Sequence, residues 1–342
     1  MNKYLYSFVV FIILLAGNIN PVVAQEEEKK IEEGWKSGAG IGLDFAQLFQ
    51  LNPKQGAGLN RIGLGGATNF FANYRKDRLA WDNQASWQFG VQRLGAGIVA
   101  QGPNTDKVPF QKSIDELRIN SKVGYATSEN SNFFYAADFS FLSQLTPTYD
   151  NPDYAGNFLS DVFGNSRELS KLFSPATIVL SLGMNYKPSE KLSIYYSPLG
   201  AKWIIVADDA IAARGVHGNP VEGELGPDGL FLDFKNVDNQ FGSLLKFNYA
   251  DKYFAEKATF TSVLSLYSNY LKNPENIDID WTNEFAVSIV KGLQLAVTVN
   301  VFYDDDVNVQ ITDKDLPNGV KPFLGKRVSL TEQLLIKYSL TF

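Results

Sequence analysis

The feature that most constrains this fold is a two-residue alternation of apolar and polar side chains that runs for unusually long stretches. In LAWDNQASWQFGVQRLG (79–95), Trp81 and Phe89 share one phase, whereas Asp82 and Gln88 occupy the other. Successive side chains of a strand point to opposite faces, so the segment predicts a strand with one apolar and one polar environment. The open question is whether the apolar environment is a protein core or lipid.

Similar runs of roughly 12 to 16 residues recur from Trp35 onward, against about 5 to 6 residues in a typical soluble strand. We predict twelve strands, at 40–51, 61–75, 78–92, 112–125, 132–143, 175–187, 190–206, 237–250, 256–271, 277–290, 293–304 and 327–342. Every second connection is short, and most of the others are long, with 52–60 and 272–276 as exceptions. This layout is typical of an up-and-down antiparallel barrel of the outer membrane, with short periplasmic turns and long extracellular loops.

A soluble sandwich or lipocalin-type barrel has the same alternation with its apolar phase inward. The charge distribution favours a membrane barrel, because the apolar phase is nearly uncharged and the other phase carries both signs. Arg or Lys on the lipid face costs about 2–4 kcal/mol at mid-depth. We therefore predict these lumen-facing charges: Asp44, Arg61, Arg75, Glu116, Arg118, Lys122, Asp138, Lys246, Glu284 and Lys337. Mixed signs favour a largely filled lumen over a wide pore selective for one charge.

The two ends of the chain fit export and insertion into the outer membrane. Lys3, an apolar run over 5–16 and the small residues ending at Ala24 predict a signal peptide over 1–24. The segment QEEEKKIEEG (25–34) predicts an acidic, flexible periplasmic lead, followed by the barrel over 35–342. No later segment has about 18 consecutive apolar residues, so no spanning helix is expected. The closing strand resembles the C-terminal insertion signal of outer-membrane barrels, on Tyr338, Leu340 and Phe342.

Several segments carry a family resemblance: EGWKSGAGIGLDFAQ, WDNQASWQFGVQRLG, IDELRINSKVGYAT, LFSPATIVLSLGMNYKPSEKLSIYYSPLGAKW and the closing strand. They are similar to a family of exported Bacteroidota proteins catalogued as a domain of unknown function. The resemblance implies an outer-membrane barrel in a Gram-negative bacterium of that phylum. It transfers no catalytic residue to this chain.

The single histidine, His217 in ARGVHGNP, is the residue on which an enzyme hypothesis depends. Hydrolysis of an envelope lipid would need this histidine beside a serine and a carboxylate or amide. No G-x-S-x-G pattern accompanies it. We therefore expect an exposed loop residue and no catalytic site.

Acidic loops offer a second possible chemistry. The main cluster comprises Asp304, Asp305, Asp306, Asn308, Asp313 and Asp315, and Asp208 and Asp209 form a smaller pair. Carboxylate and amide oxygens suit Ca²⁺ or Mg²⁺. The spacing does not match the Asp-x-Asp-x-Asp-Gly calcium loop, so a solvated loop is the expectation and an ion site the alternative.

The segment YAGNFLSDVFGNSRELSKLF (154–173) has apolar residues at helical spacing, which predicts ordered structure with a face to cover. We expect this segment to pack on its own barrel. Plugging the mouth and docking a surface partner are the alternatives.

The function classes narrow accordingly. There is no nucleotide loop, no Cys and no basic patch, and a net charge of −6 argues against nucleic acid. We expect a monomeric surface or complex-associated membrane component without a confident metal site. Its partners would be outer-membrane lipid and lipopolysaccharide, the insertion machinery and a possible envelope protein at the long loops. A small-solute channel is the alternative, and a lipid hydrolase using His217 comes third.

Overall fold

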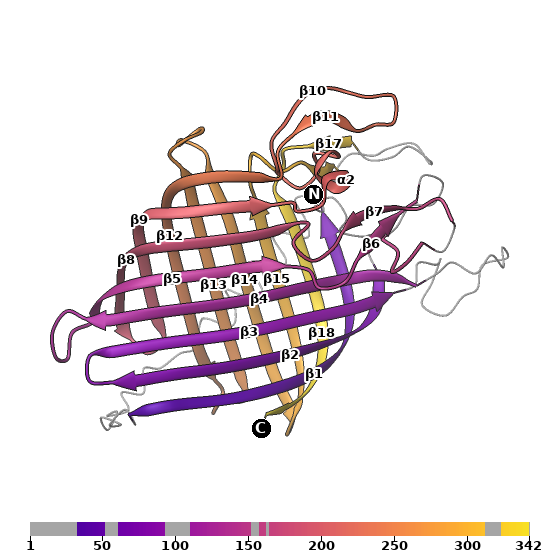
Figure 1. Ribbon diagram of the computed structural model, residues 1–342. Helices are drawn as coiled ribbons and strands as arrows, with labels where there is room; N and C mark the ends of the chain where they lie inside the picture. Colours follow the sequence, from indigo (N-terminus) through magenta and orange to yellow (C-terminus); the bar gives the residue numbers. More distant parts are fainter. Residues whose placement is uncertain are drawn as a thin grey trace, which may run out of the picture. The chain divides into compact units, whose positions relative to one another are not determined.

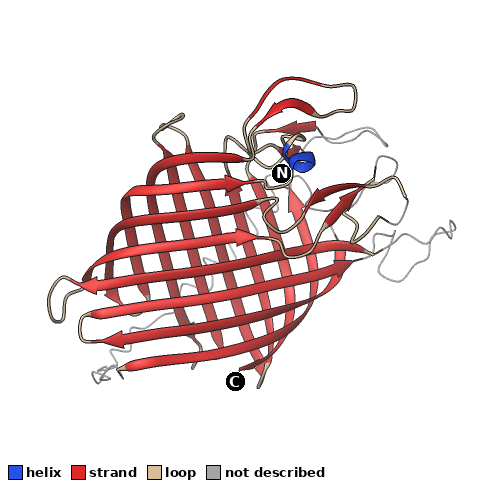
Figure 2. Ribbon diagram, viewed as in Figure 1, coloured by secondary structure: helices blue, strands red, loops and turns tan. Residues whose placement is uncertain are grey.

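Twelve strands of the computed structural model form one closed antiparallel barrel (Figures 1 and 2). The structure describes residues 33–51, 61–92, 110–151, 157–161, 164–311 and 323–341. The barrel strands are β1 (Gly34–Leu51), β2 (Arg61–Lys76), β3 (Leu79–Gln92), β4 (Gln111–Ala126), β5 (Phe133–Ser143), β8 (Ala176–Ser189), β9 (Leu192–Ile205), β12 (Val237–Tyr253), β13 (Ala258–Asn269), β14 (Ile277–Val290), β15 (Leu293–Tyr303) and β18 (Ser329–Thr341). The predicted fold class is confirmed, and each predicted strand overlaps one of these.

Barrel strands that are consecutive in the chain are hydrogen-bonded neighbours in the wall, and β1 pairs with β18 to close it. In the closing ladder, Ile41 lies opposite Leu340, and Asp44 lies opposite Lys337. The turns after β2, β4, β8, β12 and β14 are short, and the remaining connections leave from the opposite end of the barrel. The layout is therefore an up-and-down barrel with a turn end and a loop end. Among the described residues, no helix has the length and apolar character needed to span a bilayer.

The outer face of the barrel carries the apolar phase. Trp35, Tyr74 and Trp81 lie opposite one another on β1, β2 and β3, and their rings contact with centroids 5.2 and 5.5 Å apart. Leu43 and Leu64 of the same phase are each 65% exposed. The apolar stripe is therefore presented outward rather than buried between stacked sheets.

The inner face of the barrel is filled along β5 to β13. Tyr195, Leu244 and Tyr267 form a buried cluster with Ala136, and the Tyr195 hydroxyl lies 2.9 Å from Ser181 Oγ. The Tyr267 ring lies against Gly242, beside a register shift in β12. A side chain at Gly242 would place its Cβ 1.8 Å from the Ser268 carbonyl oxygen, so only glycine fits there.

Three small hairpins and one helical turn occur in the connections of the loop end, and none was expected from the sequence. They are β6 (Thr148–Asp150) with β7 (Arg167–Ser170), β10 (Val221–Leu225) with β11 (Phe231–Phe234), β16 (Val309–Ile311) with β17 (Phe323–Gly325), and α2 (Asp209–Ala212). Asp208 caps α2 by accepting a hydrogen bond from the Ile211 amide at 3.1 Å.

The helical spacing in 154–173 does not produce a helix in the described part of that segment. Residues 167–170 form β7 instead, and Phe158 exchanges two backbone hydrogen bonds with Tyr149. Cross-strand pairing buries Phe158 and Leu169 without a helical face. Phe173 packs on Phe141 of β5 with ring centroids 5.6 Å apart, so this connection packs on its own barrel. The predicted signal peptide and nearly all of the acidic lead lie outside the described residues.

Candidate functional site: the barrel lumen

The first group of lumen side chains is defined by an ion pair that crosses the barrel interior. Lys246 of β12 bonds Asp138 of β5, although β9 and β8 lie between these strands in the wall. Side chains from strands that are separated by two others on a closed sheet meet only on its concave face. Both residues therefore point inward. Because side chains alternate along a strand, this identifies which residues of the neighbouring strands also point inward.

Lys122 of β4 joins the same group, because it lies opposite both Asp82 and Asp138 in register. Its ammonium donates a hydrogen bond to Asn185 Oδ1 at 3.0 Å and lies 4.4 Å from the centroid of the Tyr195 ring. Asp82 in turn pairs with Arg75 of β2 at 2.5 Å. Each carboxylate of this layer is therefore paired with a cation, and Lys122 adds a further cation that Asn185 and the Tyr195 ring hold.

A second layer of charges lies nearer the loop end. Arg118 forms a two-pronged pair with Glu116 on its own strand, at 2.5 and 3.1 Å. Asp280 of β14, on the strand diametrically opposite β4 in the ring of twelve, is close enough to interact electrostatically with the Arg118 guanidinium. Elsewhere on the inner face, Lys337 of β18 pairs with Glu284 of β14 at 2.6 Å. Lys337 lies opposite Gln294, near the turn end of β15. Charges of both signs thus face one another across the lumen.

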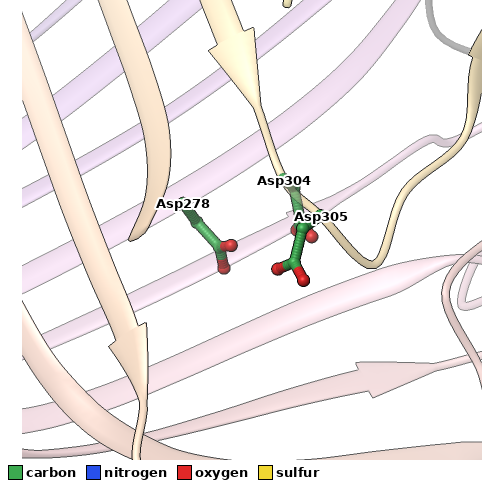
Figure 3. Close-up of side chains that lie close together, drawn as sticks. All are labelled: Asp278, Asp304 and Asp305. Atoms are coloured by element: carbon green, nitrogen blue, oxygen red, sulfur yellow. The ribbon is translucent and has the colours of Figure 1, made fainter. Parts of the chain in front are cut away.

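A third layer of charges lies at the mouth, on the loop end (Figure 3). Oxygens of Asp278, Asp304 and Asp305 lie within 4.8 Å of one another. The Lys202 ammonium bonds Asp278 at 3.0 Å and Asp304 at 3.5 Å. Asp305 accepts a hydrogen bond from Asn276 Nδ2 at 2.6 Å. The ammonium group of Lys202 therefore takes the place that a cation would have between two of these carboxylates.

The mouth cluster differs in membership from the ion site expected from the sequence. Asp304 and Asp305 belong to it, but Asp306 pairs with Lys272 at 2.5 Å instead. That pairing raises the pKa of Lys272. Asp313 and Asp315 lie outside the described residues. Asp278, at the start of β14 and remote in sequence, was missed.

The inner face of β1 to β4 differs from the filled side. Phe71 of β2 is 37% exposed although strand alternation places it inside the lumen. The neighbouring inward amides are also exposed: Asn69, Gln84, Gln88 and Asn120. The adjacent inner face of β1 carries no side chain at Gly38, Gly40 and Gly42. Water therefore reaches this part of the lumen wall.

Most of the predicted lumen charges take part in the layers described above. Asp44 lies on β1 and Arg61 lies on β2, but the positions of their side chains are outside the described part of the structure. Sequence reasoning missed Asp82, Lys202, Asp278 and Asp280. Each shares the phase of a predicted lumen charge on its own strand or on a neighbouring one, so strand parity was the available signal.

The predicted C-terminal signal is described only in part. Tyr338 is exposed on the outer face, and Leu340 belongs to β18. Phe342 lies outside the described residues. One acidic residue, Glu332, shares the outward phase of Leu334 and is exposed near the loop end of β18.

His217 is half-buried rather than exposed, which corrects the expectation from the sequence. Its Nε2 lies 2.8 Å from the Leu169 carbonyl oxygen, so the imidazole donates across to β7. Burial lowers its pKa, and the nearby Arg214 contributes in the same direction. Among the described residues, no hydroxyl or carboxylate is hydrogen-bonded to this imidazole. The geometry is that of a half-buried hydrogen bond between two connections of the loop end.

Asp208 and Asp209 stabilise the same connections. Asp208 pairs with Lys171 at 2.7 Å, which raises the pKa of Lys171 and lowers that of Asp208. Asp209 accepts a hydrogen bond from Asn236 Nδ2 at 2.9 Å. Both acidic residues are thus engaged within the protein.

Comparison with solved structures finds outer-membrane barrels at low similarity. An outer membrane channel from Pseudomonas putida F1 is 12% identical with a TM-score of 0.38, covering 94% of this chain and 100% of that chain. The translocator domain of the autotransporter NalP from Neisseria meningitidis is 7% identical with a TM-score of 0.37, covering 98% and 94%. Outer membrane phospholipase A from Escherichia coli is 10% identical with a TM-score of 0.36, covering 92% and 94%. These values do not bear on activity.

By sequence, the chain matches one family model over part of its length. No curated protein matches the chain. The family model described as "Protein of unknown function (DUF3078)" matches residues 49–149, which include β2, β3, β4 and β5.

Proposed function

We propose that this chain is an outer-membrane barrel, exported with residues 1–24 as a signal peptide. One support is the exposed apolar outer face, which suits contact with lipid. The other is the closed barrel wall, which leaves no backbone group of the barrel unpaired in lipid. A strand of 14 residues, such as β14, tilted by about 45°, rises roughly 32 Å and suits a hydrocarbon core of about 30 Å. The short turns would then face the periplasm and the long connections the outside.

We further propose that the barrel passes small solutes along the inner wall of β1 to β4. The observation that carries this proposal is the exposure of Phe71 inside the lumen, beside exposed amides and a glycine-lined strand. Lys246–Asp138 and the aromatic cluster occupy the opposite side of the lumen. A passage beside a filled half is narrow, so the solute would be small.

Planar-bilayer recording of the purified barrel tests the passage, and two neighbouring glycines supply a matched pair of variants. Gly42 points inward, and the nearest atoms to an added Cβ are backbone oxygens 3.8 and 4.0 Å away. Gly66, on the adjoining β2, points outward. Gly42→Trp should reduce unit conductance at least about twofold, whereas Gly66→Trp should leave it unchanged. A wild-type barrel that folds but shows no conductance would overturn the proposal.

A second candidate function is a closed surface component that binds an envelope protein. Lys246–Asp138 favours it, because this ion pair joins two non-adjacent strands through the interior and so fills part of the lumen. Silent bilayers together with a reproducible partner in mild-detergent copurification from native membranes would favour this role. A lipid hydrolase is the least supported reading, since His217 bonds a backbone carbonyl.

A further inference from the structure

We propose that Phe71, Gln84 and Asn120 form a binding row for a neutral, hydroxyl-rich solute of the saccharide class. This inference rests on the proposed passage and specifies what the passage recognises. The three residues come from three consecutive strands, β2, β3 and β4.

The three side chains lie side by side across the wall. Phe71 is opposite Gln84, and Gln84 is opposite Asn120. All three are exposed, and all share the inward phase fixed by Lys122 and Asp138. No register shift interrupts the ladders at these positions. The row therefore presents one aromatic ring and two amides to the same space.

The space next to the row is open on one side. Gly38 of β1 lies opposite Phe71, and Gly40 lies opposite Asn69, one inward position further along β2. No side chain extends from β1 over the Phe71 ring at these positions. The ring can therefore offer a face or an edge to a solute.

Most of the charges that flank the row are paired within the wall. Toward the turn end, Asp82 pairs with Arg75. Toward the loop end, Glu116 pairs with Arg118. Lys122, beside Asn120 on the turn-end flank, forms no salt bridge among the described residues, but its ammonium group donates to Asn185 Oδ1 and lies against the Tyr195 ring. The three side chains of the row are themselves uncharged, so they offer no charge to a free anion or cation. A neutral solute suits this stretch better than an ion.

The row itself has unused hydrogen-bonding capacity. Among the described residues, neither Gln84 nor Asn120 is hydrogen-bonded through its side chain. Each amide offers two donors and one carbonyl acceptor, which matches a hydroxyl that both donates and accepts. An aromatic ring supplies apolar contact for the C–H face of a sugar ring, and few polar groups on an apolar surface are typical of small-molecule sites. Ring and amides together thus match the chemistry of a saccharide.

Maltotriose is the probe, and channel block is the measurement. We expect maltotriose to reduce the single-channel current of the wild-type barrel in a saturable manner, and triethylene glycol to cause no saturable block. Phe71→Leu and the double variant Gln84→Ala/Asn120→Ala should each raise the half-blocking concentration about tenfold or more. Phe70→Leu is the matched control, because Phe70 neighbours Phe71 but points outward and is 54% exposed.

Failure of this inference can be told apart from failure of the passage. Conducting channels that maltotriose does not block, or blocks equally in the Phe71→Leu variant, would overturn the binding row and leave the passage intact. If the folded barrel does not conduct, calorimetric titration of maltotriose into the detergent-solubilised protein tests the row directly. Heat that saturates in the wild type and Phe70→Leu but not in Phe71→Leu supports the row, and no saturable heat overturns it.

Discussion

The ammonium group of Lys246 on β12 contacts the carboxylate of Asp138 on β5 across two intervening strands, β9 and β8. The two side chains are only 18% and 10% exposed. Removing one partner leaves the other charged and poorly solvated. The pair is therefore a sensitive point of the barrel interior.

Lys246→Met should lower the free energy of unfolding by about 3 kcal/mol, the lower end of the range for broken buried pairs, because water still reaches part of this pair. Lys246→Met/Asp138→Leu should recover part of that loss, since no unpaired charge remains. Urea unfolding of the refolded barrel in detergent measures both. Lys191→Met is the control, because Lys191 lies at a turn with its side chain 54% exposed, and its pair with Asp251 should contribute less than about 1 kcal/mol. Equal losses in Lys191→Met and Lys246→Met would contradict the prediction.

Gly242→Ala should prevent stable folding, because the added Cβ would meet the Ser268 carbonyl oxygen 1.8 Å away and the Tyr267 ring 3.1 Å away. A backbone carbonyl in a ladder cannot rotate aside, so the cost should exceed the roughly 1–3 kcal/mol of ordinary overpacking. The folded fraction is read from heat-modifiable migration on gels. Gly66→Ala meets only ordinary contacts at 3.5 and 3.7 Å and should fold like the wild type. A fully folded Gly242→Ala barrel would show that the close approach is not real.

Acid should loosen the connection that carries His217. Its pKa in the folded protein is lowered, so the unfolded chain binds the proton more readily. The stabilisation is therefore present above the ordinary histidine pKa of about 6.5 and is lost as pH falls through the lowered folded value. The protection factors of amides around His217 and Leu169, which correct for the base-catalysed intrinsic exchange rate, should be lower at pH 5 than at pH 7.5. His217→Gln keeps an N–H donor but does not titrate, and its protection factors should change less with pH. The same pH response in both proteins would rule out His217 as the cause.

Lys202→Met should convert the mouth cluster into a calcium site. Oxygens within 4.8 Å of one another can surround one Ca²⁺ at bond lengths of about 2.3–2.6 Å. In the wild type the ammonium group occupies that position. Calcium should therefore raise the melting temperature of Lys202→Met relative to chelator, and should leave that of the wild type unchanged. A wild-type response as large as that of the variant would mean that Lys202 does not exclude the ion.

Alternation along the chain was enough to predict the twelve barrel strands, because one side-chain period governs both faces of a strand. It also placed Lys122, Asp138 and Lys246 in one phase, as the ion pairs require. It could not predict which charges meet, since Lys202 and Asp278 are brought together only by the closed wall. The β7 hairpin was missed because apolar residues at helical spacing can be buried equally well by strand pairing, as Phe158 is.

The closing ladder between β1 and β18 has a consequence for assembly. The first strand of the wall can find its second partner only after the last strand has left the ribosome, so the slowest contact to form is also the one of greatest sequence separation. Until then β1 and β15 each present an unpaired edge, a template for association with other chains. The chain is thus most exposed to aggregation before closure, and the pairing of β18 with both β1 and β15 removes the two edges at once.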